Sequence, residues 1–204
     1  MSILLTNDDG IDAPGLYELA EALLELAPVH IVAPKHEMSG VGHAITIRTP
    51  LRVRELEQKP NGVSRLSVDG TPADCVKFAL KRYCSEQPLL VVSGPNAGPN
   101  VGVNVLYSGT LGAAFEAVIG GVSAVAVSSD VQKGSWSAGE WDWRACRHYG
   151  LQVARMALAW ECERRNLGRG KEDPDRDYYG RGTRPFLLNL NVPAMPPEKV
   201  KGLR

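Results

Sequence analysis

The chain of 204 residues carries 23 Lys and Arg against 23 Asp and Glu, so its formal net charge is zero. This balance gives no electrostatic reason to expect a nucleic-acid or membrane partner, and the length suits one α/β domain with a full hydrophobic core. No apolar run reaches the length of a membrane span, and no basic region followed by an apolar stretch marks a signal peptide. Because the four cysteines form no CxxC pair, we expect reduced thiols in a cytoplasmic protein.

The beginning of the chain predicts a β-α-β unit. A strand over 2–6 precedes a helix that begins at Pro14, where the missing N–H of proline costs no hydrogen bond. Four apolar residues then have the spacing of one buried helix face: Leu16, Leu19, Ala20 and Leu23. Pro28 ends this helix, and a second strand over 29–33 completes a right-handed unit.

The rest of the chain continues to alternate between strand and helix patterns. Thr71, Pro72 and Asp74 form a capping signature that starts a helix. The further helices and strands that we expect are strands 44–49, 51–56, 64–68, 89–92, 122–127 and 186–192, and helices 72–84, 110–120 and 145–165. This order predicts a single three-layer, doubly wound, Rossmann-like α/β domain over 1–204 with a mostly parallel sheet. The polar, glycine-rich segment 166–184 is expected to be a flexible loop.

Two adjacent carboxylates, Asp8 and Asp9, follow the first strand, at the edge where open α/β sheets bind ligands. An Asx turn that caps the first helix is the structural alternative. Because like charges repel, a hard cation would make this pair favourable. In a doubly wound sheet, the loops with Ser39 and Asn96 converge on the same edge. These four oxygen donors favour Mg²⁺ or Mn²⁺ over zinc.

A turn of Ser108, Gly109 and Thr110 leads into the helix over 110–120. Free N–H groups at a helix start form an anion pocket, so we favour phosphate binding here over an ordinary N-cap. His43 either touches a substrate or packs a loop. Three tryptophans frame a Gly- and Ser-rich loop, where we expect packing over an apolar edge: Trp136, Trp141 and Trp143.

Six ordered motifs resemble the SurE family of stationary-phase survival proteins, which are metal-dependent nucleotidases. The motifs are ILLTNDDGIDAPGL, the SG and GHAIT of MSGVGHAIT, VDGTPADCV, VVSGPNAGPNVG, YSGTLGAAFEA and LNLNVP. The resemblance implies one Mg²⁺ or Mn²⁺ per subunit, held by Asp8, Asp9, Ser39 and Asn96. It also implies substrate phosphate contacts from Asn96 and from the turn of Ser108, Gly109 and Thr110.

We therefore predict a 5′- or 3′-nucleotidase, a phosphomonoesterase that hydrolyses nucleoside monophosphates, with short polyphosphate as a further substrate. Asp8 and Asp9 are the catalytic residues, and the sequence does not choose which of them is the general base. A non-catalytic nucleotide- or phosphate-binding protein on the same fold is one alternative. A hydrolase that forms an aspartyl phosphate is another, although such enzymes usually carry DxD.

The last expected strand is followed by the twelve residues Pro193–Arg204, among them three prolines. Members of the resembled family usually continue with an extended arm that is exchanged between subunits. We therefore expect at most a homodimer.

Overall fold

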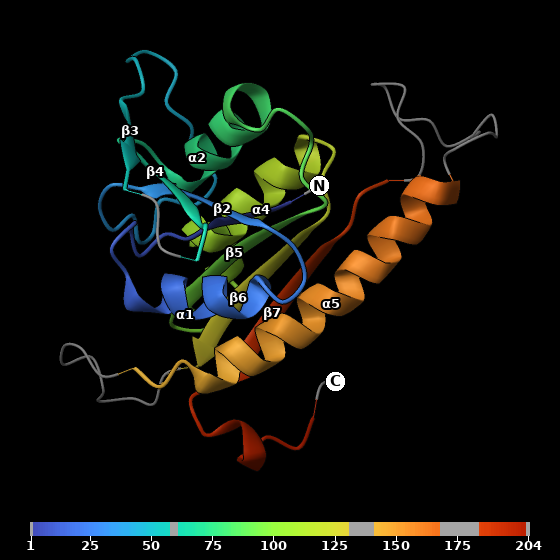
Figure 1. The fold of residues 1–204 in the computed structure, drawn as a ribbon. Coiled ribbons are helices and arrows are strands. Elements are labelled where there is room, and N and C mark those ends of the chain that lie inside the picture. Colours follow the sequence, from blue (N-terminus) through green and yellow to red (C-terminus); the bar gives the residue numbers. More distant parts are fainter. Residues whose placement is uncertain (1, 58–60, 131–140, 168–183, 203–204) are drawn as a thin grey trace.

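The computed structural model describes residues 2–57, 61–130, 141–167 and 184–202 (Figure 1). These residues form one seven-stranded sheet in the order β3-β4-β2-β1-β5-β6-β7. The strands are β1 (Ile3–Thr6), β2 (Val29–Pro34), β3 (Val53–Leu56), β4 (Ser64–Val68), β5 (Leu90–Ala97), β6 (Ala124–Asp130) and β7 (Leu187–Pro193). Neighbouring strands are parallel except for the antiparallel pair β3 and β4.

Helices cover both faces of the sheet, as Figure 1 shows. They are α1 (Pro14–Leu23), α2 (Pro72–Phe78), α3 (Asn104–Tyr107), α4 (Gly109–Ile119) and α5 (Arg144–Leu167), with the π-helical turn η1 (Ala79–Tyr83) and the 3₁₀ turn η2 (Pro197–Lys199). Helices α1 and α5 pack against each other on one face, and α2 and α4 do so on the other. The predicted three-layer, doubly wound fold is therefore confirmed. Among the described helices, none combines the length and apolar character that crossing a membrane requires.

The alternating side chains of β1 show how the sheet builds two cores. Ile3 and Leu5 point into the core under α1 and α5, whereas Leu4 points into the core under α2 and α4. All three side chains are fully buried. A central strand that is buried on both faces consists of consecutive apolar residues, as the run Ile3, Leu4 and Leu5 does.

The capping signature before α2 is confirmed. The Asp74 N–H donates to Oγ1 of Thr71 over 3.1 Å, and the Thr71 N–H donates to Oδ2 of Asp74 over 2.9 Å. The predicted helix over 72–84 is interrupted, because α2 ends at Phe78 and continues as the π-helical turn η1.

The predicted strand over 44–49 is wrong, because this segment is a loop. The backbone N–H and the hydroxyl of Thr46 donate to the two carboxylate oxygens of Asp74, over 2.8 and 2.6 Å. The Thr71 hydroxyl donates to the carbonyl oxygen of Ala44 over 2.7 Å. These side chains satisfy backbone groups that a sheet would otherwise bind, and Ile47 is left 82% exposed.

Strand β5 is longer than predicted and extends into the segment that we expected to be a loop from 93 onward. Its pairing with β6 shifts register between Ser93 and Asn96, so that Asn96 lies at the end of the sheet. Position 94 requires glycine, because its φ is +124° and an added Cβ would lie 2.2 Å from the carbonyl oxygen of Val127.

Two expectations fall on segments outside the description. Most of the predicted loop over 166–184 is not described, although α5 continues through residue 167. Trp136 also lies outside the described residues.

Candidate active site

The paired carboxylates lie on a tight turn directly after β1. The Asn7 side-chain amide donates to the carbonyl oxygen of Gly10 over 2.9 Å and closes this turn. Gly10 has φ of +99°, and a Cβ added there would lie 3.2 Å from the carbonyl carbon of His36. The Met38 N–H donates to the carbonyl oxygen of Asp8 over 2.7 Å. The turn is therefore held against the loop that follows β2.

Both carboxylates border a cavity of about 640 Å³ at the carboxyl edge of the sheet. The residues predicted from the sequence that line it are Asp8, Asp9, Ser39, Asn96 and Ser108. The structure thus brings together all four predicted metal ligands and the first residue of the predicted phosphate turn. The convergence of loops after β1, β2 and β5 follows from the strand order.

Asp8 is held by the start of α4. Its Oδ1 accepts from the Thr110 hydroxyl over 2.8 Å, and its Oδ2 accepts from the Thr110 N–H over 3.2 Å. Burial raises the pKa of Asp8 above its usual value, and the hydrogen bonds from Thr110 oppose this rise. Because Asp8 is only 3% exposed, its carboxylate is fixed in orientation and poorly hydrated.

Asp9 is the less buried carboxylate of the pair, and its pKa is raised as well. Burial, followed by the nearby charge of Asp8, raises the pKa of Asp9 to about 7, while a hydrogen bond from the Ala97 N–H opposes the rise. Two carboxylates this close are unfavourable when both are ionised. A divalent cation between them would remove the repulsion.

Ser39 and Asn96 present further oxygen atoms to the same cavity. The Ser39 hydroxyl donates to Oε1 of Glu37 over 2.7 Å. The Asn96 Nδ2 donates to the carbonyl oxygen of Gly98 over 2.7 Å, so Oδ1 is the Asn96 atom suited to bind a cation. Glu37 also lines the cavity and adds to the upward pKa shift of both aspartates.

The donor set therefore fits a hard cation. Among the described residues, no three His, Cys, Asp or Glu side chains are grouped closely enough to bind a metal by themselves. The hydroxyl of Ser39 and the amide oxygen of Asn96 would have to complete the coordination. An all-oxygen set of this kind suits Mg²⁺ or Mn²⁺.

The three residues of the predicted phosphate turn take different positions. Ser108 caps α4, since its Oγ accepts from the Leu111 N–H over 3.1 Å, and it also lines the cavity. Gly109 packs on Asp8, where an added Cβ would lie 2.9 Å from the Asp8 Cβ. Thr110 is fully buried behind Asp8 and does not border the cavity. The turn holds the first carboxylate, and its contact with phosphate stays a prediction.

Asn100 is a site residue that sequence reasoning missed. Its side-chain amide donates to the Thr110 hydroxyl over 3.3 Å and to the Ser128 hydroxyl over 2.9 Å. Its backbone N–H donates to Oδ1 of Asn191 over 2.8 Å, and its carbonyl oxygen accepts from Nδ2 of Asn189 over 2.9 Å. The only sequence signal was the presence of asparagines in the motifs VVSGPNAGPNVG and LNLNVP. Nothing in the sequence indicates that asparagines of one motif bind those of the other.

His43 packs a loop instead of facing the cavity. Its Nε2 lies 3.0 Å from Oε2 of Glu116, and Oε1 of the same carboxylate lies 3.1 Å from Nζ of Lys77. Trp141 and Trp143 do line the cavity. Trp143 is also packed in the core, where a Cβ added at Gly15 would lie 2.7 Å from its ring.

The fold and the site together define a class of protein: a doubly wound α/β protein with oxygen donors grouped around a cavity at the carboxyl edge of its sheet. The family model described as survival protein SurE matches residues 3–204 of the chain. The chain therefore belongs to the SurE family.

Individual relatives agree with this assignment. The chain is 40% identical over 203 residues to the 5′-nucleotidase SurE of Moorella thermoacetica, covering 100% of this chain and 68% of the relative. It is 42% identical over 205 residues to that of Carboxydothermus hydrogenoformans, covering 100% and 69%. The crystal structure of the SurE protein from Aquifex aeolicus superposes with a TM-score of 0.75 at 32% identity, covering 100% of this chain and 71% of that one. The chain spans about two thirds of the length of these curated relatives.

Proposed function

We propose that the chain is a metal-dependent 5′-nucleotidase that hydrolyses nucleoside monophosphates to nucleoside and phosphate. The observation that carries this proposal is the pair Asp8 and Asp9 on the wall of one cavity with Ser39 and Asn96. Membership in a family whose curated relatives are named 5′-nucleotidase supports the reaction class. Hydrolysis of 3′-monophosphates and of short polyphosphate belongs to the same proposal.

Asp8, Asp9, Ser39 and Asn96 would hold one Mg²⁺ or Mn²⁺. When bound, such a cation polarises a phosphoryl oxygen and lowers the pKa of a bound water. Asp8 would serve as the fixed member of the set, since Thr110 already binds both of its oxygens.

Asp9 is the carboxylate of the pair that is better placed to accept a proton. It lines the cavity, and it is less buried than Asp8. Burial and the charge of Asp8 raise the pKa of Asp9 to about 7 in the metal-free chain, and a cation bound between the two carboxylates would lower it again, so the role of base rests on the position of Asp9 in the cavity.

Ser108 is the residue of the turn that can contact a phosphate oxygen. Its Oγ accepts from the Leu111 N–H, so its own hydroxyl hydrogen remains available to donate into the cavity. The positive end of α4 lies at the same place and favours negative charge there.

The test is phosphate release from 5′- and 3′-nucleoside monophosphates in the presence of Mn²⁺. We expect turnover in the parent chain, and a loss of several orders of magnitude in Asn96→Ala. Asp12→Asn is the matched control, because Asp12 is an exposed acid near the same turn and does not line this cavity. Metal-dependent nucleotide binding without phosphate release would favour the non-catalytic alternative, and a trapped phospho-aspartate would favour the covalent one.

The cytoplasmic location and an assembly no larger than a homodimer are also part of the proposal. The four cysteines, which are free thiols, support a reducing compartment.

A further inference from the structure

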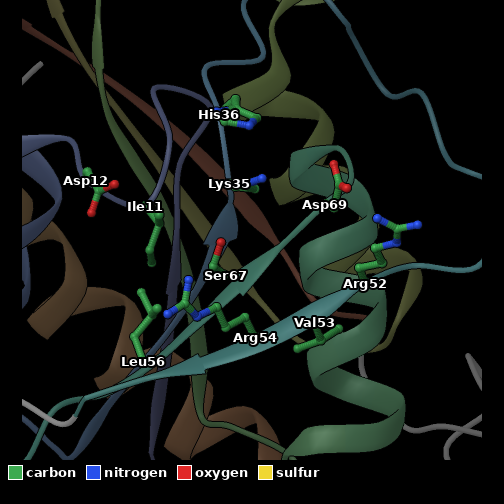
Figure 2. Close-up of a pocket in the computed structure, with 10 residues that line it drawn as sticks. All are labelled: Ile11, Asp12, Lys35, His36, Arg52, Val53, Arg54, Leu56, Ser67 and Asp69. Carbon is green, nitrogen blue, oxygen red and sulfur yellow. The ribbon is translucent and has the colours of Figure 1, made fainter.

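A second cavity, of about 390 Å³, borders the same two loops that carry the active-site carboxylates and Ser39 (Figure 2). Its lining includes Ile11, Lys35, Arg52, Arg54, Leu56 and Ser67. None of the four predicted metal ligands lines it. It is therefore a different space from the one proposed for the substrate.

The floor of this second cavity is a strip of the sheet beside α1. Arg54 and Ser67 are direct partners in the antiparallel pair of β3 and β4, and Leu56 follows Arg54 by two residues. These three side chains consequently share one face of the sheet. Helix α1 packs on the neighbouring strands β1, β2 and β5. The cavity lies beyond α1, over the strands β3 and β4 at the edge of the sheet.

Three basic side chains, Lys35, Arg52 and Arg54, line this cavity together with two carboxylates, Asp12 and Asp69. Within the described part of the chain, Lys35, Arg52 and Arg54 form no ion pair. Figure 2 shows the guanidinium group of Arg54 turned toward Leu56 and Ser67. Arg52 is instead turned toward the side of Asp69.

Several features suit this floor to an oxyanion. A guanidinium group binds phosphate and carboxylate oxygens through two parallel N–H donors, and an ammonium group adds charge without strict geometry. Ser67 is 7% exposed and contributes a hydroxyl to the cavity wall. Ile11 and Leu56 supply apolar surface next to these polar groups. The combination of clustered cations, one hydroxyl and an apolar wall is typical of sites for small organic anions.

We propose that this cavity is a second ligand site, which binds a small organic molecule carrying a phosphate-type oxyanion. The oxyanion binds Arg54, Lys35 and the hydroxyl of Ser67, and the apolar body lies on Leu56 and Ile11. Asp12 and Asp69, at the margins of the cavity, oppose a second negative group on the same ligand.

The backbone connects this second site to the first. The Ile11 N–H donates to the carbonyl oxygen of Pro34 over 2.8 Å, and the Met38 N–H donates to that of Asp8 over 2.7 Å. A ligand bound to Ile11 and Lys35 therefore contacts both of the loops that carry the active-site residues Asp8, Asp9 and Ser39. Binding does not depend on the proposed nucleotidase activity, but an effect of binding on turnover does.

The test uses phenylphosphonate, whose carbon–phosphorus bond resists hydrolysis, in a chelator buffer at constant ionic strength. Amide chemical shifts locate the probe and give its dissociation constant. We expect saturable shifts at Ile11, Val53 and Ser67. Arg54→Gln weakens the affinity about tenfold or more, and Arg82→Gln, a change at an exposed arginine of η1, leaves it unchanged.

The outcomes separate this proposal from the proposed function. Shifts confined to Ser108, Gly109 and Leu111, or wild-type affinity in Arg54→Gln, would place the probe in the active site or on no defined site, and the inference would be wrong. Ser67→Ala provides a second variant should Arg54→Gln lower the unfolding temperature. Binding that depends on Arg54 in a chain that releases no phosphate supports the second site while the nucleotidase proposal fails.

Discussion

The hydroxyl of Thr110 donates to Oδ1 of Asp8 over 2.8 Å, and the N–H of the same residue donates to Oδ2 over 3.2 Å. One residue at the start of α4 thus binds both oxygens of a carboxylate that lies 102 positions earlier in the chain. This contact fixes the orientation of Asp8 before any cation binds. A carboxylate that is positioned in advance loses less conformational entropy when it becomes a ligand.

Replacing Thr110 by valine removes the hydroxyl and keeps the shape of the side chain. We expect the free energy of unfolding to fall by about 1–3 kcal/mol, because a buried carboxylate oxygen loses its partner. Affinity for Mn²⁺ falls as well. Thr110→Ser is the control that retains the hydroxyl. Denaturant unfolding and calorimetric Mn²⁺ titration give the two values, and an unchanged stability with a raised KM would instead favour direct phosphate contact.

Removal of divalent cations should abolish phosphate release. In the proposed site, a cation would offset the repulsion between the two carboxylates and would polarise the phosphoryl group. Dialysis against a chelator followed by addition of Mg²⁺ or Mn²⁺ is expected to restore the rate and to raise the unfolding temperature. Full turnover after exhaustive chelation would contradict the proposed site.

The substitution Asp9→Asn is expected to lower the rate by several orders of magnitude and to stabilise the metal-free protein at neutral to alkaline pH. Burial and the charge of Asp8 raise the pKa of Asp9 from 3.8 to about 7. Ionisation of Asp9 therefore costs stability, and the cost grows as the pH rises from the unfolded value through the folded one. In chelator at about pH 8, the variant should gain on the order of 1–2 kcal/mol in free energy of unfolding.

The same comparison at about pH 4 supplies the check, because the folded state then holds the proton and the unfolded state is only about half ionised, so the gain should shrink to well below about 1 kcal/mol. Asp12→Asn serves as the matched control. Equal stabilisation of Asp9→Asn at both pH values would show that burial and Asp8 do not set the behaviour of this carboxyl group.

Glu161 on α5 carries a prediction about stability alone. It is fully buried and accepts from Ser123 Oγ at 2.6 Å, Arg164 Nε at 2.8 Å and Arg165 Nε at 2.7 Å. Burial raises the pKa of Glu161, but the hydrogen bonds from these partners outweigh it, so that the pKa lies below its usual value. This stabilisation is present above the unfolded pKa and is lost as the pH falls through the folded one.

Glu161→Gln should therefore cost about 3 kcal/mol at neutral pH, because the half-buried Arg164 and Arg165 lose the charge of a fully buried carboxylate. The cost should shrink toward acidic pH. Denaturant unfolding at both pH values measures it, and Glu163→Gln, a change at an exposed neighbour on the same helix, is the control. A pH-independent difference would contradict the role assigned to the charge.

Apolar periodicity was sufficient to predict most of the sheet, because strands buried on both faces leave little freedom in composition. Apolar periodicity failed over 44–49, where Ile45 and Ile47 alternate with the polar residues Thr46 and Arg48 as in a strand. There the carboxylate of Asp74 binds the backbone of Thr46, and no pattern within the segment reveals a partner that is 28 positions away. The strand predicted from apolar periodicity also ends before β5 does, because Gly94 and Pro95 are ordinary loop residues in other proteins.

The sequence also predicted which side chains meet at the cavity, because the strand order of a doubly wound sheet brings Asp8, Ser39 and Asn96 to one edge. It did not reveal Glu37, whose position follows from its hydrogen bond with Ser39. It likewise assigned Thr110 to the substrate, whereas the structure shows it bound to Asp8. Helix-start residues have the same composition in both roles, so only the three-dimensional contact separates them.

The asparagines of β7 bear on when the protein becomes active during its synthesis. Asn189 and Asn191 hold Asn100, Asn100 contacts Thr110, and Thr110 holds Asp8. The aspartates leave the ribosome among the first residues, yet their support is complete only once β7 has paired with β6. A prematurely terminated product that lacks β7 would keep the contact between Thr110 and Asp8 but would lose the two asparagine side chains that hold Asn100 against Thr110.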